Sequence, residues 1–188
     1  MFEVKIKLTE DLLGTVPKDK EVFSTYIETK KPKNQGEEEV ENVEEIEEAG
    51  WTGFMKDDQG VFIYDYMIRG FLKNAGNILK DDLKLKNLKS KINDRVFVFP
   101  RKIHFGKSEP DGVLERPLRG MTAKGPRVSL ARSDYIVAGT EISFSVDIVG
   151  GGKEITEELI WKLLEYGRFC GLGQWRNGSY GRFEVLHR

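Results

Sequence analysis

Apolar and polar residues follow regular patterns in four stretches of the chain, and these patterns predict four β-strands. Residues 2–8 (FEVKIKL) and 140–148 (TEISFSVDI) place an apolar side chain at every second position, which is typical of a strand with one buried face. Residues 95–105 (RVFVFPRKIHF) open with an apolar run that predicts a strand buried on both faces and ended by its proline, with RKIHF as a candidate continuation. Residues 181–187 (GRFEVLH) predict the last strand.

Two other stretches repeat apolar residues with the period of a helix. In residues 65–79 the apolar positions fall at i, i+3, i+4, i+7 and i+11 counted from Ile68, which gives one apolar face. Asp65 is the expected N-cap of this helix. Residues 156–166 predict a second helix capped by Thr156, with two glutamates in its first turn. The lysine-rich residues 80–95 predict an amphipathic surface helix.

These elements follow one another as β-α-β-β-α-β, the ferredoxin-like order of an α+β domain. In this fold both helices cover one face of a four-stranded antiparallel sheet, and in RNA-recognition domains the other face stacks bases. We interpret residues 1–188 as a single domain with two insertions. The first, 9–64, is an acidic segment followed by a hairpin, and the second, 106–138, is a protruding loop or ribbon.

Charge is spread unevenly along the chain. The formal net charge is only -1, but residues 37–48 hold eight glutamates and no basic residue, whereas residues 101–132 hold eight Lys or Arg against three acids. A phosphate group interacts with the charges close to it. The uneven distribution of charge is therefore more informative about nucleic-acid binding than the net charge is. We interpret the acidic segment as an exposed helix or a partly disordered stretch, and its alternative is a decoy that imitates nucleic acid.

Composition excludes several classes of protein. The chain is 39% hydrophobic with 11 Phe and 3 Trp, which is enough for a core. A single cysteine, Cys170, excludes an intramolecular disulfide and a cysteine-rich zinc site, and His104 and His187 show no metal-ligand spacing. We expect neither a metal nor another cofactor. The first residues lack the apolar core of a signal peptide, and no apolar run reaches membrane-spanning length, so we expect a soluble cytoplasmic protein without a membrane partner.

The glycine-rich loop, residues 167–183 (GRFCGLGQWRNGSYGRF), stands out between the second helix and the last strand. It holds five glycines, three arginines and four aromatic residues. Glycine allows positive φ and close approach of another chain, while arginines and aromatic rings suit phosphates and bases. We therefore predict that the loop docks a single-stranded nucleic acid or another backbone.

Three segments resemble those of the RAMP superfamily, the RNA-binding backbone and guide-RNA-processing subunits of CRISPR effector complexes. Residues 171–183 resemble its C-terminal glycine-rich loop, residues 63–76 (IYDYMIRGFLKNAG) its entry into the first helix, and residues 133–146 (SDYIVAGTEISFSV) its strand pair with a Gly-Thr turn. Residues 9–50 depart from the family pattern. The resemblance implies either an effector subunit or a stand-alone relative from a phage or mobile element, which would bind its own nucleic acid or imitate a host subunit.

The residues that we expect to bind nucleic acid are basic or aromatic and lie in the first helix, the 106–138 insertion and the glycine-rich loop. The partner that they suit is RNA or single-stranded DNA, bound by a homo-oligomer or a larger ribonucleoprotein. They are Arg69, Lys73, Arg116, Arg119, Lys124, Arg127, Trp175, Arg176, Tyr180 and Arg182, with Gly171, Gly173, Gly178 and Gly181 shaping the loop.

No constellation of residues predicts catalysis as clearly as this set predicts binding. His104 lies beside two basic residues, and RAMP processing nucleases often use a histidine as general base, so it is the weak candidate for a metal-independent endoribonuclease. Cys170 has no neighbouring histidine in the sequence and is assigned to packing. A third hypothesis is an inhibitor or protein-interaction module that acts through residues 37–48.

Overall fold

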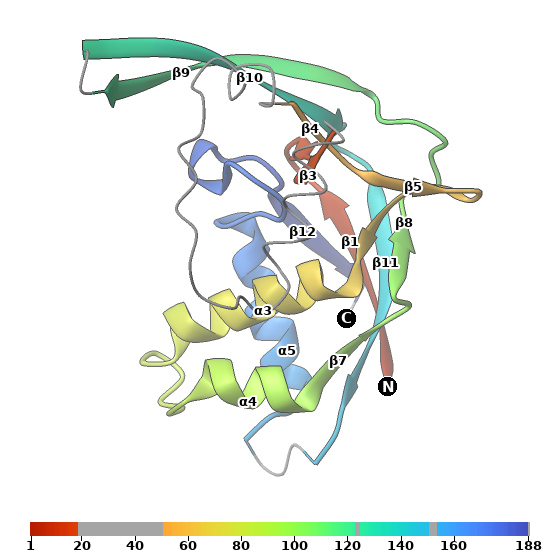
Figure 1. Cartoon of the computed structure of the whole chain (residues 1–188). Helices are drawn as coiled ribbons and strands as arrows, with labels where there is room; N and C mark the ends of the chain where they lie inside the picture. Colours follow the sequence, from red (N-terminus) through yellow and green to blue (C-terminus); the bar gives the residue numbers. More distant parts are fainter. Residues whose placement is uncertain (19–50, 123–124, 151–153, 188) are drawn as a thin grey trace, which may run out of the picture.

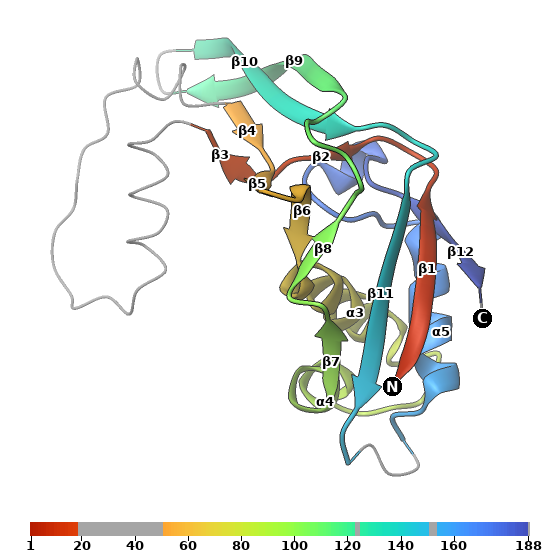
Figure 2. The same ribbon diagram turned by 90° about the vertical axis from the view of Figure 1, so that its right-hand side faces the viewer.

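The computed structural model describes residues 1–18, 51–122, 125–150 and 154–187, with residues 118–122, 125–129 and 187 described by their backbone alone. The acidic segment 37–48 lies outside the described residues. Four antiparallel strands form the central sheet in the order β12-β1-β11-β7, which confirms the predicted ferredoxin-like fold (Figures 1 and 2). These strands are β1 (Phe2–Leu8), β7 (Val96–Phe99), β11 (Glu141–Ile148) and β12 (Phe183–His187).

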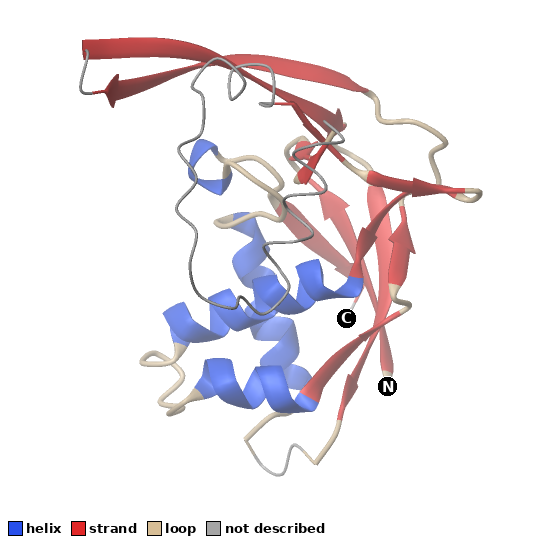
Figure 3. Cartoon of the chain, in the orientation of Figure 1, coloured by secondary structure: helices blue, strands red, loops and turns tan. Residues whose placement is uncertain are grey.

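Helices cover one face of this sheet (Figure 3). They are α3 (Asp65–Leu79), α4 (Leu88–Arg95) and α5 (Glu157–Glu165). The alternation in β1 turns Val4, Ile6 and Leu8 toward them, and all three are buried. The Phe71 ring of α3 meets the Phe183 ring of β12 edge-on, with the ring centres 5.0 Å apart. Burial of each such side chain contributes roughly 1.5–3 kcal/mol to folding.

One predicted helix cap is confirmed and the other is wrong. Thr156 Oγ1 accepts a hydrogen bond from the Leu159 backbone N–H at 3.2 Å, as an N-cap does. Tyr64, not Asp65, is the N-cap residue of α3, and it makes no side-chain cap hydrogen bond. Asp65 lies in the first turn of the helix, where its carboxylate contacts Arg101 Nη1 at 3.2 Å.

Residues 80–105 differ from the sequence prediction in three ways. Only the second half of 80–95 is a helix, α4. β7 exposes one face, because Val96 and Val98 are buried while Phe99 is exposed. Residues 101–105 do not continue β7: Pro100 has no backbone N–H to extend the ladder, and β8 (Lys102–His104) belongs to a separate sheet with the hairpin of β5 (Met55–Asp57) and β6 (Gly60–Tyr64).

A further sheet lies at the end of the molecule away from α4 (Figures 1 and 2). Its two long strands pair antiparallel from end to end as a ribbon that extends beyond the rest of the fold. At its base the ribbon pairs with two short strands, and a third short strand pairs with one of these, so the ribbon is joined to the body of the protein. The strands are β9 (Gly112–Thr122), β10 (Gly125–Ile136), β2 (Leu12–Leu13), β3 (Val16–Pro17) and β4 (Trp51–Gly53).

The face of the central sheet away from the helices is polar in its two middle strands. Lys5 of β1 pairs with Glu141 of β11 at 2.5 Å, and Ser145 donates a hydrogen bond to Glu3 at 2.7 Å. These strands therefore offer no aromatic base-stacking platform of the kind that RNA-recognition domains use. Among the described residues, no helix is long and apolar enough to cross a membrane.

Candidate nucleic-acid interface

The glycine-rich loop folds back on itself through backbone contacts. It contains the short helices η1 (Tyr166–Arg168) and η2 (Arg176–Gly178). The Leu172 N–H donates to the Gly181 carbonyl at 2.9 Å. Gly181 has φ +71°, and a Cβ there would lie 2.9 Å from the Leu172 nitrogen and closer still to its carbonyl oxygen. A Cβ on Gly171 would in turn meet the backbone around Gly181. Only glycine fits at this crossing of two chain segments.

The folded loop is also fixed to the chain that follows β1. The Gly181 N–H donates to the Asp11 carbonyl at 2.8 Å. A Cβ on Gly173 would lie 2.6 Å from the Leu13 carbonyl oxygen, and Leu172 is buried in the core. The four predicted glycines therefore make the loop rigid rather than flexible; the fourth, Gly178, lies against the Trp175 ring.

Three of the predicted binding residues come together on this rigid loop and the ribbon. The rings of Trp175 and Tyr180 stack with their centres 5.2 Å apart and their planes 12° apart. The Arg116 guanidinium of β9 lies over the Trp175 ring, with Cζ 4.1 Å from the ring centre. Trp175 itself is held at φ 52°, a conformation that side-chain-bearing residues rarely adopt and that clusters at functional sites.

Arg116 is buried without a full set of partners. Only 9% of the residue is exposed, and among the described residues its Nε and Nη1 have no hydrogen-bond partner. Desolvation by burial lowers the pKa of this guanidinium, and the interaction with Tyr180 opposes that shift. Each unsatisfied buried donor costs about 1–3 kcal/mol, more when it is charged. An anion that reached these two nitrogens would remove that cost.

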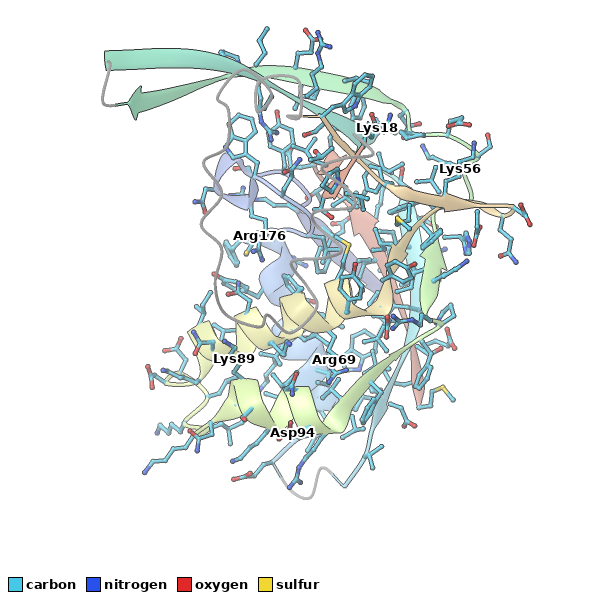
Figure 4. All side chains as sticks on the ribbon, in the orientation of Figure 1. Lys18, Lys56, Arg69, Lys89, Asp94 and Arg176 are labelled. Carbon is cyan, nitrogen blue, oxygen red and sulfur yellow. The ribbon has the colours of Figure 1, made fainter. Side chains whose placement is uncertain are left out.

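A groove of about 290 Å³ separates the loop from the first half of α3. Gly70 lines this groove. A Cβ added at Gly70 would have no neighbour within 4 Å. Asn74 reaches from α3 toward the loop, its Nδ2 3.8 Å from Cys170 Sγ. Arg176 lines the loop side and lies above α3 in Figure 4. The groove thus has one cationic side chain, an aromatic wall at Tyr66 and open glycine backbone.

A polar network that the sequence did not reveal joins the loop to the base of the ribbon. Gln174 Nε2 donates to the hydroxyls of Thr52 and Ser133, the latter at 2.7 Å. Beside them Asp134 is 2% exposed and accepts hydrogen bonds from Lys18 Nζ and, at 2.8 Å, from Trp51 Nε1. The partners are distant in the chain, so no local pattern in the sequence marks them.

Arg69 and Lys73 are adjacent as predicted, but they lie apart from the glycine-rich loop. Arg69 donates to the Asn93 carbonyl and Lys73 to the Asn93 side chain at 3.2 Å, so both turn toward α4. Figure 4 shows Arg69 between α3 and α4. Arg182 directly precedes β12 and is half-buried, and its Nε has no hydrogen-bond partner among the described residues. The side chains of Arg119, Lys124 and Arg127 lie outside what the structure describes.

His104 lies in the small sheet of β5, β6 and β8. Its Nε2 is 2.9 Å from Asp57 Oδ1, and the other carboxylate oxygen of Asp57 is 2.6 Å from Lys102 Nζ. The hydrogen bond from Lys102, followed by that from His104, holds the pKa of Asp57 far below its usual range. The His–Asp pair could orient an imidazole for proton transfer. Across the described part of the chain, no cluster of three or more His, Cys, Asp or Glu could hold a metal ion.

Comparison with known proteins finds solved structures that share this fold. No protein-family model and no curated protein matches the chain by sequence. Solved structures do match, among them a chain of type III-B Cmr-β in a cryo-electron microscopy structure with cognate target RNA bound, with a TM-score of 0.53 at 12% sequence identity. The alignment covers 98% of this chain and 58% of that one, so the chain spans little more than half of its neighbour's length. At this identity, the likeness is one of fold.

Proposed function

We propose that the chain is a non-catalytic RNA or single-stranded nucleic-acid binding protein of the RAMP type. The observation that carries the proposal is the buried guanidinium of Arg116, unpartnered on two nitrogens and held against the ring of Trp175, whose neighbour in the chain, Arg176, lines the groove. The fold shared with a chain of an RNA-bound Cmr-β structure supports it. So does the resemblance of the glycine-rich loop to the family's own.

The chemistry of the interface suits a single strand rather than a duplex. Trp175 is 41% exposed, so part of its ring remains available to a base. Stacking of one base on such a ring contributes about 1–3 kcal/mol. Arg116 and Arg176 supply charge for the phosphates next to that base. The groove along Gly70 lets the sugar-phosphate backbone approach the helix closely, where a larger residue would hold it away.

The alternative is a metal-independent endoribonuclease that uses His104. The observation in its favour is the His104–Asp57 pair, because a carboxylate that fixes an imidazole prepares it to accept a proton. A transition state would also need oxyanion stabilisation, and Lys102, which could supply it, is occupied by the same Asp57. Binding is therefore the better supported function, and cleavage is tested by His104→Ala.

Assembly into a homo-oligomer or a larger ribonucleoprotein belongs to the same proposal. The ribbon of β9 and β10 offers an extended surface on which a neighbouring subunit could dock. A second form of this proposal is that the chain acts alone, as a product of a phage or mobile element. In that case no neighbouring subunit is needed. An inhibitor that works through residues 37–48 remains the third hypothesis, and deleting that segment tests it in a pull-down.

Fluorescence anisotropy with labelled oligouridine tests the binding proposal. The wild type is expected to bind at low salt. Trp175→Ala combined with Arg176→Ala is expected to weaken binding by at least about 5-fold, because the loss of one stacked base alone costs about 1–3 kcal/mol and Arg176 adds a phosphate contact. The matched control is Phe169→Ala with Arg168→Ala, which removes an exposed aromatic and an arginine from the same loop away from the groove. Absence of binding by the wild type, or equal loss in both double variants, would refute the proposal.

A further inference from the structure

A second and larger groove runs between the end of α3 and the start of α4. Its volume is about 890 Å³, and we call it the lysine groove because five lysines line it: Lys73, Lys80, Lys84, Lys86 and Lys89. Asp81 is the only acidic residue among the described residues that line it. Figure 4 shows Lys89 here, well away from Arg176 and the glycine-rich loop. A strongly cationic groove in a chain of net charge -1 is a local feature that needs a ligand-based explanation.

The lysines of this groove are unpaired, unlike most others. Among the described residues, Lys80, Lys84, Lys86 and Lys89 are exposed and form no ion pair. Of the eight described lysines outside the groove, six pair with carboxylates, namely Lys5, Lys18, Lys56, Lys91, Lys102 and Lys107. The charge of the groove is therefore available to an outside anion.

The backbone that carries these lysines is held in place by the leucines between them. In residues 83–89 (LKLKNLK), Leu83 and Leu85 pack against the core and Leu88 is fully buried. Lys84 adopts φ 54°, so the turn alternates inward leucines with outward lysines. The Leu85 N–H donates to the Lys80 carbonyl at 2.9 Å and closes the turn. Cations on such a frame lose less freedom on binding than cations on a flexible tail.

The lining chemistry favours a phosphodiester backbone over a protein. The described residues that line the groove include no aromatic residue, whereas the centres of protein interfaces are enriched in aromatic residues and depleted of lysine. Lysine is a compact point charge that contacts phosphate without reading a base. The groove would therefore hold a strand by its phosphates and leave the bases unread.

The lysine groove also continues the groove at the glycine-rich loop. Gly70 and Asn74 line the first hollow, and Lys73 and Asn77, one helical turn apart, line the second. From Gly70 to Lys80 the helix rises about 15 Å. A strand that leaves the loop along the exposed side of α3 would reach the lysines over that distance.

We propose that the lysine groove binds the phosphodiester backbone of the single-stranded nucleic acid after it leaves the glycine-rich loop. This inference rests on the proposed function for the identity of the ligand. The groove would be a second contact region for the strand. With it, the protein would cover a longer stretch of nucleic acid than the loop alone covers.

The test compares two variants of the full chain that each lose four positive charges. The groove variant replaces Lys80, Lys84, Lys86 and Lys89 with glutamine. The control replaces four lysines outside the groove, Lys5, Lys7, Lys56 and Lys162, with glutamine. Anisotropy of labelled oligouridines of about 5 and about 16 nucleotides is measured over a range of salt, with circular dichroism melts to confirm folding.

The groove variant is expected to bind the long oligouridine with a salt dependence that is weaker by up to about 3 in the log–log slope, since each phosphate contact on a single strand contributes about 0.7. Its binding of the short oligouridine is expected to match the wild type. Equal slopes for the wild type and the groove variant, or equal losses in the groove and control variants, would overturn the inference. Labelled polyglutamate is measured in the same way. A groove variant that loses binding of polyglutamate but keeps the binding of the long oligouridine would also overturn the inference, because it would indicate an acidic protein partner.

The two proposals fail in different ways. If the wild type binds and the Trp175→Ala, Arg176→Ala variant binds equally well, the function assigned to the loop fails, while the groove variant still reports on the lysines. If the loop variant is weakened and the groove variant is not, only the lysine groove is refuted. A wild type that binds neither oligouridine refutes both.

Discussion

The Arg116 guanidinium lies 4.1 Å from the centre of the Trp175 ring, and two of its nitrogens have no hydrogen-bond partner among the described residues. A desolvated cation–π contact contributes about 2 kcal/mol. Two unsatisfied donors cost about 1–3 kcal/mol each. The combined cost of about 2–6 kcal/mol equals or exceeds the gain, so a bound anion that paired with these donors would stabilise the arrangement.

Replacing Arg116 with methionine should therefore separate stability from binding. Methionine keeps much of the side-chain volume but removes the charge and the unsatisfied donors, so the free energy of unfolding is expected to stay level or to rise by about 1 kcal/mol or more. The affinity for oligouridine is expected to fall. Urea denaturation and anisotropy measure the two effects. Arg132→Met, at an exposed arginine paired with Glu115, should change stability by less than about 0.5 kcal/mol. A clear loss of stability in Arg116→Met would mean that the guanidinium is already paired.

The glycine-rich loop should tolerate no side chain at its crossing point. Gly181→Ala places a Cβ against the Leu172 backbone at φ +71°, and a loss of at least about 3 kcal/mol in the free energy of unfolding is expected. Gly70→Ala is the matched control, because nothing lies near its Cβ position and it is inside a helix. It should stabilise the protein by about 1 kcal/mol. Chemical denaturation of both variants checks this, and similar losses at the two sites would contradict it.

Asp57 should make stability depend on acid pH. Its pKa is lowered in the folded protein by Lys102 and then by His104, so the ionised carboxylate stabilises the fold above the unfolded pKa of about 3.9 and that contribution is lost as the pH falls below it. From neutral pH down to about 5, the urea midpoint of the wild type should be higher than that of Asp57→Asn. The gap should then narrow at lower pH. The control, Asp58→Asn, should have the same urea midpoint as the wild type at every pH. A difference between the wild type and Asp57→Asn that does not depend on pH would contradict this account.

Features encoded within one element were predictable from the sequence. The alternation of residues 2–8, the apolar face of α3 and the cap at Thr156 each depend on neighbours a few positions away, and each matches the structure. The order of these elements was sufficient to predict the ferredoxin-like sheet. Residues 101–105 were assigned to the wrong sheet, because their pattern is that of a strand and does not specify a partner.

The site was predictable only in part, for a related reason. Helical spacing placed Arg69 and Lys73 on one surface, which is correct, but only the position of α4 decides that this surface faces Asn93 and not the loop. Trp175 and Tyr180 were correctly placed in one loop. Their contact with Arg116, and the bonds from Gln174 to Thr52 and Ser133, join segments whose proximity depends on the whole fold.

The attachment of the ribbon at its base has a thermodynamic consequence. Arg116 on β9 contacts Trp175, and Ser133 on β10 bonds to Gln174, so both strands of the ribbon touch the same loop. A force or a partner that displaces the ribbon must alter the geometry of that loop. If the ribbon binds a neighbour and the loop binds nucleic acid, as proposed, the two affinities are linked, and each ligand changes the affinity for the other by the same factor.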